Sequence, residues 1–393
     1  MRTESPSRPS RAGKSLTVAY VVSMADGLQS FVYREIRELR STGVSVILLP
    51  TRIGSGPYQP PVDWPVARAT LVRIIAAHLR FLAHDSGGYW RVLSEALKMG
   101  ALLDFLVAVF FATVVRGQDA RLIHCHFGDH KLFIGYFAGK LSGVPVSVTV
   151  HAYELYSNPN PPLFRRAIAN VNAIVTVAEY NRSVLERKWG APKNRIFVIP
   201  LFADIPPFHP QREQEGEKIV IATVARLVPK KGHRTLLEAV SMLPPNYETW
   251  IVGTGPLNLR EMAIRLHVQD RVKLLGRVSD AELDAIYRTA DIFCLPSETA
   301  TEGDREGVPV ALMEAMSHGL PVVATRHAGV PELVHEVLVS ERDPRALADA
   351  LLTLGGDRRL RQQHGRTNYD IVSDRFSRAN VLLLKSVFER IAS

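Results

Sequence analysis

Two basic residues in the second half of the chain have the spacing expected of a diphosphate site. Arg226 follows an apolar run at 219–225, and Lys231 with Gly232 comes directly before a helical pattern. The first turn of a helix presents unpaired N–H groups and the positive end of the helix dipole, so it attracts anions. Two cations beside such a helix start predict a diphosphate site, and solvated loop cations are the alternative.

Two glutamates further along the chain have the chemistry to bind sugar hydroxyls. Glu306 lies in an acidic loop beside Gly307, and Glu314 lies on the helix that Pro309 begins. One carboxylate can accept hydrogen bonds from both hydroxyls of a vicinal diol. We therefore expect Glu314 to suit a ribose and Glu306 to suit a sugar. The alternatives are a helix-start glutamate stabilised by the dipole for Glu306 and an exposed helix face for Glu314.

The elements that must position these residues alternate along both halves of the chain. Apolar runs rich in Val, Ile and Leu are separated by helical patterns of ten or more residues. This order is typical of a parallel sheet covered by helices on both faces. We therefore predict an α/β protein of two Rossmann-like, doubly wound domains that face a central cleft. Functional loops should follow the carboxyl ends of the strands.

Composition along the chain sets the domain limits. Residues 1–15 are rich in Pro, Ser and basic side chains, so we expect a disordered basic tail. Prolines and a charged run near residues 201–217 indicate a linker. We place an N-terminal domain at 16–205 and a C-terminal domain, which carries the diphosphate candidates, at 206–375. A final helix at about 376–393 is expected to pack back on the N-terminal domain.

The cysteines and the apolar runs restrict the compartment. Cys125 and Cys294 each lie in an apolar, strand-like run, which suits a reducing compartment, so a cytoplasmic protein is expected. The apolar run Ala101–Val115 contains Asp104 and is shorter than the roughly 20 residues of a bilayer span. No membrane-spanning helix is therefore predicted.

The positive charge of the chain lies in its first half. The formal charge is +9, and residues 1–205 contain 24 Lys and Arg against 14 Asp and Glu. Such a half favours a phosphorylated substrate, an anionic membrane or nucleic acid. Aromatic residues do not interleave with the basic ones, so no nucleic-acid partner is expected. With the apolar run Ala101–Val115, the charge indicates an anionic, lipid-linked binding partner and peripheral contact at the inner membrane face. A buried helix is the alternative for that run.

Two motifs of the second half carry a family resemblance. VARLVPKKG at 224–232, followed about eighty residues later by EGVPVALMEAMSHGLPVVAT at 306–325, resembles family 4 of the retaining GT-B glycosyltransferases. The resemblance is strongest over residues 219–335. It implies a GT-B fold and transfer of a sugar from a nucleoside-diphosphate sugar, with retention of anomeric configuration and without a metal.

The resemblance also assigns roles to the candidate residues. Arg226 and Lys231 would hold the donor diphosphate, Glu314 the ribose and Glu306 the transferred sugar. Charge building on the departing diphosphate would be stabilised chiefly by Arg226, Lys231 and the helix dipole. Further donor contacts would come from the helix start and from backbone groups beside the sugar and the nucleobase, at Gly232, Gly307, Val308, Arg277 and Val278.

The first half resembles glycosyltransferases that build bacterial extracellular and surface polysaccharides, through the segments at 23–46, 122–156 and 172–190. In such a protein His151 would face the transferred sugar and bind a hydroxyl near the reacting carbon, although a histidine after a strand is also a common structural feature. The loop SMADGLQ offers only Gly27 for close approach of the backbone to the diphosphate.

Two further histidines lie on one predicted strand of the first half. We expect His124 and His126 to point to opposite faces, one in the core and one lining the cleft, which argues against a shared metal ion. No metal site and no cofactor are predicted, the nucleoside-diphosphate sugar being a substrate.

The sequence therefore predicts a retaining glycosyltransferase with a glycan or lipid-linked acceptor, acting in cell-surface or extracellular polysaccharide biosynthesis. Two other classes stay open at this point. A nucleotide-sugar epimerase would share the architecture and the donor site but need no acceptor. A sugar- or nucleic-acid-binding module would share the fold and lack the chemistry.

Overall fold

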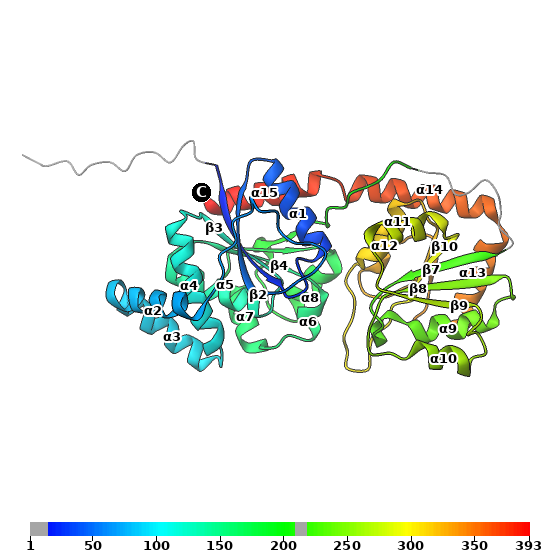
Figure 1. The fold of residues 1–393 in the computed structure, drawn as a ribbon, viewed down its shortest axis with the longest axis horizontal. Helices are drawn as coiled ribbons and strands as arrows, with labels where there is room; N and C mark the ends of the chain where they lie inside the picture. Colours follow the sequence, from blue (N-terminus) through cyan, green and yellow to red (C-terminus); the bar gives the residue numbers. More distant parts are fainter. Residues whose placement is uncertain (1–14, 209–217) are drawn as a thin grey trace, which may run out of the picture. The chain divides into compact units, whose positions relative to one another are not determined.

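The computed structural model describes residues 15–208 and 218–393 (Figure 1). All but the last residue of the tail predicted at 1–15 lies outside the described residues, as does the 209–217 part of the predicted linker. The described chain forms two six-stranded sheets, and the strand pairs β1–β2, β1–β3, β7–β8 and β10–β11 are all parallel. The predicted class, two α/β domains with parallel sheets, is confirmed.

The first sheet has the strand order β2-β1-β3-β4-β5-β6. Its central strands carry short runs of Val, Ile and Leu and are buried along their whole length, as strands covered on both faces should be. The strands are β1 (Thr17–Met24), β2 (Ser45–Ile53), β3 (Leu122–His126), β4 (Val146–Val150), β5 (Ala173–Thr176) and β6 (Ile196–Val198).

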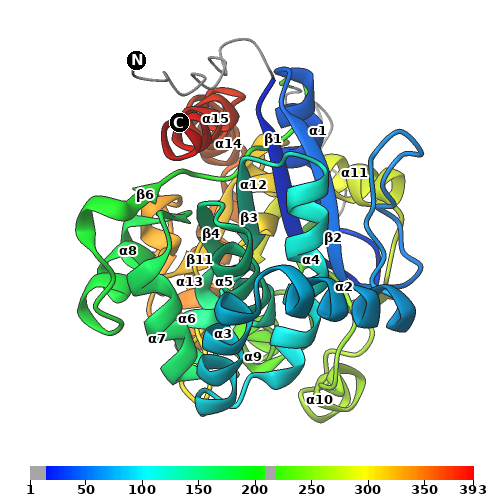
Figure 2. The same cartoon turned by 90° about the vertical axis from the view of Figure 1, so that its left-hand side faces the viewer.

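Helices connect these strands and cover the sheet (Figures 1 and 2). Helix α5 is buried almost all round, because its glycines let it pack directly on the strands. A Cβ at Gly135 would lie 2.1 Å from the Cys125 sulfur. The helices are α1 (Ser30–Ser41), α2 (Leu71–His84), α3 (Ser86–Lys98), α4 (Leu102–Gly117), α5 (His130–Ser142), α6 (Ala152–Tyr156), α7 (Pro161–Asn170) and α8 (Glu179–Arg187).

The second sheet has the strand order β12-β11-β10-β7-β8-β9. Its strands are β7 (Ile219–Val224), β8 (Tyr247–Val252), β9 (Val272–Gly276), β10 (Ile292–Leu295), β11 (Val322–Thr325) and β12 (Leu338–Val339). Its helices are α9 (His233–Met242), α10 (Leu259–Arg265), α11 (Asp280–Thr289), α12 (Val310–Ser317), α13 (Pro344–Gly356) and α14 (Arg358–Arg375). One hydrophobic core joins β7, β8 and β10 to α9 and α13.

The apolar run at Ala101–Val115 is a core helix. It forms most of α4, in which Phe105, Ala108 and Phe111 are fully buried. The buried-helix alternative is therefore correct for this run, and its central side chains do not reach a membrane. Within the described residues, every helix is too short or too polar to cross a bilayer.

The last helix, α15 (Ala379–Ala392), carries side chains of the first sheet's core at its end. The buried Phe388 ring lies 4.9 Å from the ring of His124 and 6.2 Å from that of Tyr20. Lys385 Nζ donates to the Thr42 carbonyl at 2.9 Å. The end of the chain thus covers the face of the sheet at the paired strands β1 and β3, where the rings of Tyr20 and His124 would otherwise be exposed.

We predict that Phe388→Ala lowers the free energy of unfolding by about 3–5 kcal/mol, since it removes a buried ring and leaves a cavity. Thermal and urea unfolding of the full chain measure the loss. Leu382→Ala in the same helix is the control, because Leu382 is 49% exposed and should change stability by less than about 0.5 kcal/mol. Equal losses in the two variants would show that the Phe388 ring is not part of the core.

Candidate functional site

The diphosphate and sugar candidates lie on loops that follow neighbouring strands. Strands β7 and β10 pair in parallel through Ile221 with Ile292 and Ala222 with Phe293. Their carboxyl ends therefore meet at one edge of the sheet, where ligands of such folds bind. The loop after β7 carries Lys230 and Lys231, and the loop after β10 carries Asp304 and Glu306.

These four side chains form an ion cluster, defined here as Lys230, Lys231, Asp304 and Glu306. Lys231 Nζ lies 3.0 Å from one oxygen of Glu306, and Lys230 Nζ lies 3.2 Å from the other. Lys230 Nζ also lies 3.0 Å from Asp304 Oδ2. The two lysine side chains are only 7% and 12% exposed, so each positive charge depends on its carboxylate partners.

The charge of Glu306 is held in place by the two lysines. Burial alone would raise the pKa of this carboxyl. The charges of Lys231 and Lys230, with their hydrogen bonds, outweigh burial and lower the pKa below its usual value. Glu306 is therefore a carboxylate that accepts hydrogen bonds, which suits sugar hydroxyls, and it does not act as an acid there.

Gly232 sets the start of helix α9 against the end of β10. Its φ of +67° is a left-handed conformation, and a Cβ would lie 1.7 Å from the Pro296 carbonyl oxygen. Only glycine fits both constraints. The first turn of α9 therefore begins right beside the buried lysines, as the sequence predicted for a helix start in an anion site.

Arg226 has a different environment from Lys231. Its side chain is exposed, and its carbonyl accepts a hydrogen bond from His233 Nε2 at 3.0 Å. Burial lowers the pKa of His233, and the charge of Lys231 adds to this, so the ring is neutral near pH 7. Among the described residues no ion pair joins Arg226 to Glu306 or Glu314. The guanidinium is thus a solvated group at the rim of the same loop.

The other donor candidates lie around this edge. Glu314 is half-buried on α12, and its carboxylate accepts from the Tyr287 hydroxyl at 3.4 Å. Gly307 is buried, with its carbonyl 3.0 Å from where a Cβ at Gly329 would lie. Arg277 and Val278 follow β9, before the Ser279 cap of α11, and Val308 is half-buried in the loop before α12. Their assigned contacts with donor, ribose and base stay predictions.

A hydrogen-bond relay, defined here as His327 and Glu341, fixes the backbone of Glu306. The Glu306 N–H donates to His327 Nε2 at 3.0 Å, so the ring proton is on Nδ1. That Nδ1–H donates to Glu341 Oε1 at 2.6 Å. The other oxygen of Glu341 accepts from the Thr299 N–H at 2.8 Å. Both ends of the 297–308 loop are thereby tied to residues after β11 and β12.

We predict that His327→Ala lowers kcat/KM about 10–100-fold, because Glu306 loses the acceptor that orients its backbone. His327→Gln should retain most activity, since its amide oxygen can replace Nε2 as acceptor. Steady-state transfer rates and melting temperatures are measured for both variants. Both variants lose the contact to Glu341, and His327→Ala also leaves a cavity, so rates are measured well below both melting temperatures. An equal loss of activity in His327→Gln and His327→Ala would contradict a positioning role.

The first-sheet candidates lie at strand ends of their own. Gly27, after β1, has a φ of +74°, and a Cβ there would lie 2.9 Å from the Tyr58 carbonyl oxygen, so the position requires glycine. His151 follows β4 directly, and its ring packs 4.8 Å from that of Phe127. Contact of His151 with the transferred sugar stays a prediction.

The expectation for His124 and His126 is wrong. Residues two apart on a strand point to the same face, and both side chains are fully buried. Their rings lie 5.9 Å apart, and Glu35 lies 3.5 Å from His126 Nδ1. In the described chain these three residues form the one His/Cys/Asp/Glu group with the geometry to hold a metal ion. Tyr20 donates to Glu35 at 3.1 Å, so a buried hydrogen-bond network accounts for the group equally well.

Glu154, on α6, is a buried carboxyl beside His151. One of its oxygens accepts from the Gly128 N–H at 2.7 Å and from the His151 N–H at 3.4 Å. The other is buried without a hydrogen-bond partner among the described residues. Burial raises the pKa of Glu154 to about 7, so the side chain holds a proton in mildly acidic solution.

The raised pKa of Glu154 makes a pH-dependent prediction. The folded protein binds this proton up to about pH 7, whereas the unfolded chain releases it near pH 4.5, so stability falls as pH rises between these values. Glu154→Gln keeps the acceptor and lacks the charge. The free energy of unfolding of this variant should gain on that of the wild type between pH 5 and pH 8, by on the order of 3 kcal/mol.

Melting curves at closely spaced pH values measure this effect. The exposed Glu302→Gln is the control and should follow the wild type at every pH. A wild-type minus Glu154→Gln difference that does not change with pH would show that Glu154 is ionised throughout.

Several of these residues carry no signal in the sequence. Lys230 is next to Lys231 and has the same side chain, so the chain itself does not show which of the two is more deeply buried. Asp304, His327 and Glu341 lie in three separate segments and meet Glu306 only in the folded structure. The doubled lysine before a helix and the acidic loop at 302–306 were the only available hints.

Comparison with solved structures defines the class of the fold. Anabaena HepE, solved with UDP and glucose, has a TM-score of 0.73 at 18% identity, covering 96% of this chain and 100% of HepE. Sucrose-phosphate synthase of Thermosynechococcus elongatus has a TM-score of 0.73 at 16% identity, covering 96% and 99%. At such identities the likeness concerns the fold alone, and that fold is GT-B.

Sequence comparison defines the family. The profile described as Glycosyltransferase Family 4 matches residues 25–205, and that described as Glycosyl transferases group 1 matches residues 204–371. The putative colanic acid biosynthesis glycosyltransferase WcaL of Escherichia coli is 34% identical over 281 residues, 67% of this chain and 68% of WcaL. The amylovoran biosynthesis glycosyltransferase AmsK of Erwinia amylovora is 41% identical over 298 residues, 67% and 71%.

The chain therefore belongs to the group 1 and family 4 glycosyltransferases. This membership confirms the predicted family and favours glycosyl transfer over the epimerase and the binding module.

Proposed function

We propose that this protein transfers a sugar from a nucleoside-diphosphate sugar to a glycan or lipid-linked acceptor, with retention and without a metal ion. The observation that carries the proposal is the ion cluster at the start of α9. Two nearly buried lysines there have carboxylates as their only ion-pair partners among the described residues. A diphosphate has the charge and size to replace Glu306 as the ion-pair partner of Lys231. The Glu306 carboxylate would then accept hydrogen bonds from sugar hydroxyls.

The chemistry follows from where charge builds. As the bond between the anomeric carbon and the diphosphate oxygen breaks, its electron pair moves to the leaving diphosphate. The lysines and the N–H groups of the first turn of α9 stabilise this charge, a task often given to a metal ion. An acceptor hydroxyl then attacks the same face of the sugar, and its proton passes to the departing phosphate. Arg226 at the rim adds long-range attraction for the donor.

The relatives support a role in polysaccharide synthesis. WcaL and AmsK are named for colanic acid and amylovoran biosynthesis, and HepE was solved with UDP and glucose. We infer a polysaccharide or its lipid-linked precursor as the acceptor; a lipid-linked acceptor would bring the enzyme to the inner membrane face. The two cysteines are buried and form no disulfide, which supports the cytoplasmic location expected from the sequence.

We predict that Lys231→Ala lowers kcat/KM for the donor about 10²–10³-fold, because one stabilising cation is removed from the leaving group. Lys218→Ala is the control, since Lys218 is 64% exposed and pairs with Glu248, away from the ion cluster. Transfer is measured with UDP, GDP and ADP sugars and membrane-extracted acceptor.

Two outcomes would contradict this proposal. Activity abolished by excess chelator and restored by magnesium would show that a metal, rather than the lysines, stabilises the diphosphate. Formation of an epimer from the donor alone, at a rate matching turnover, would assign the site to an epimerase.

A further inference from the structure

Helix α11 brings a buried tyrosine to the carboxylate that the sequence assigns to the donor ribose. Tyr287 is 2% exposed, and its hydroxyl donates to Glu314 Oε2 on α12 at 3.4 Å. A buried phenol needs a hydrogen-bond partner for its polar tip. Here the partner is a side chain assigned to the ligand, so the contact that satisfies Tyr287 also acts on Glu314.

The ring of Tyr287 is fixed by its neighbours. Its centre lies 4.9 Å from that of the His318 ring and 6.0 Å from that of the Phe293 ring. Phe293 belongs to β10 and is fully buried. The phenol hydroxyl therefore has a defined position. A glutamate has a long, rotatable side chain, and fixing it before a ligand arrives lowers the entropy cost of binding.

His318 fixes the backbone of the same glutamate. Its Nδ1 donates to the Glu314 carbonyl at 2.8 Å, and its Nε2 lies 3.0 Å from Asp284 Oδ1 on α11. The last carbonyls of a helix have no partner within the helix, so His318 caps the end of α12 and joins it to α11. Glu314 is thus held through its carbonyl by His318 and through its carboxylate by Tyr287.

The contact with Tyr287 leaves Glu314 able to bind a diol. A carboxylate offers about four acceptor positions, and the phenol takes one of them. The Glu314 side chain is half-buried, so solvent still reaches it. Two hydroxyls of a ribose would therefore meet a carboxylate that is already oriented.

We propose that Tyr287 is a positioning residue for the donor, which orients the Glu314 carboxylate and makes the site selective for an intact ribose. Tyr287 acts through Glu314 and does not touch the donor. Helix α11 also follows the predicted base contacts at Arg277 and Val278, so one element serves base and ribose. The inference rests on the proposed function, because its ligand is a nucleoside diphosphate.

The experiment is calorimetric titration of the full chain with UDP, GDP and ADP, and then with the 2′,3′-dideoxy analogue of the nucleotide that binds. The wild type should bind the analogue on the order of thirtyfold more weakly, because it offers no hydroxyl to Glu314. Tyr287→Phe should bind the intact nucleotide about tenfold more weakly and the analogue like the wild type. Discrimination between the two would fall to about threefold.

A double variant separates positioning from a general loss of structure. Glu314→Gln should itself lose most of the discrimination, because it replaces one acceptor oxygen by a donor. Tyr287→Phe added to Glu314→Gln should then weaken binding little further, since the two residues act through one contact. Melting temperatures of all variants are measured alongside the titrations.

Tyr247→Phe is the matched control for loss of a buried phenol hydroxyl. Tyr247 is 5% exposed and begins β8, and its hydroxyl lies against α13 beside Gly355. The amino end of the strand is the end away from the loops of the site. This variant should bind the intact nucleotide and the analogue like the wild type.

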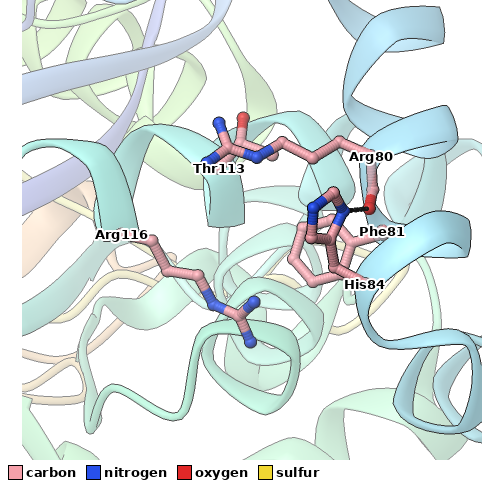
Figure 3. A pocket seen from close by; sticks show the side chains of 5 residues that line it. All are labelled: Arg80, Phe81, His84, Thr113 and Arg116. Carbon is pink, nitrogen blue, oxygen red and sulfur yellow. Dashed lines mark hydrogen bonds between the residues drawn. The ribbon is translucent and has the colours of Figure 1, made fainter.

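A cation-lined cavity between α2 and α4 supplies a control for binding elsewhere. Arg80 and His84 of α2 line it with Thr113 and Arg116 of α4, and it encloses about 180 Å³ (Figure 3). Its guanidinium groups attract anions. Arg80→Gln should nevertheless leave the affinity for both nucleotides unchanged, because Arg80 is exposed and belongs to the other sheet's helices.

Three results would overturn the inference. The first is an unchanged discrimination in Tyr287→Phe, with or without weaker binding, which would show a structural role alone. The second is a full effect of Tyr287→Phe in the Glu314→Gln background. The third is a wild type that binds the nucleotide and its analogue equally. A wild type that binds none of the three nucleotides would overturn the proposed function as well, so the two failures are distinguishable.

Discussion

The site depends on keeping two positive charges, those of Lys230 and Lys231, in loops from which water is largely excluded. Lys230 and Lys231 are side by side in the chain and almost fully buried, and removing such charges from water costs several kcal/mol unless they are paired. Asp304 and Glu306 provide the pairing from the next loop. The loop that carries Asp304 and Glu306 must therefore keep a fixed conformation, because the lysine charges need these partners. The lysines in turn keep Glu306 in its charged form.

The surrounding structure serves this constraint. Parallel pairing of β7 with β10 brings the two loops to one edge. Gly232 allows α9 to begin against the Pro296 carbonyl, and His327 with Glu341 holds the backbone of Glu306. In the resting protein the carboxylates take the place of an anion. Binding of a diphosphate is then an exchange of partners at preformed cations, and it needs little reorganisation of the loops.

Much of this was predictable from the sequence because the relevant signals are local. The alternation of apolar runs and helical patterns predicted both sheets, and the glycine before a helical pattern predicted the start of α9. Lys231 and Glu306 were found from residue type and position, and the structure joins them at 3.0 Å. Arg226 was expected to hold the diphosphate together with Lys231. Its side chain is exposed, and its contact with the diphosphate stays a prediction.

The remaining features depend on tertiary packing. Helices α2 and α3 were not predicted, since α2 has apolar residues on its exposed side as well as its buried side and shows no clear periodicity. His124 and His126 were assigned to opposite faces, although a period of two puts them on one. The contacts of Lys230, His327 and Glu341 join segments that are far apart in the chain, by up to 75 residues between Lys230 and Arg305. No local sequence pattern encodes such contacts.

The most direct test of the exchange of partners is calorimetric titration with UDP, GDP and ADP. The nucleotide that binds is then titrated into Glu306→Gln, Lys231→Ala and the double variant. If the diphosphate displaces Glu306 from Lys231, Glu306→Gln should bind it about tenfold more tightly, Lys231→Ala about tenfold more weakly, and the gain from Glu306→Gln should shrink in the double variant. Unchanged affinity in Lys231→Ala, or weaker binding in Glu306→Gln, would contradict the account.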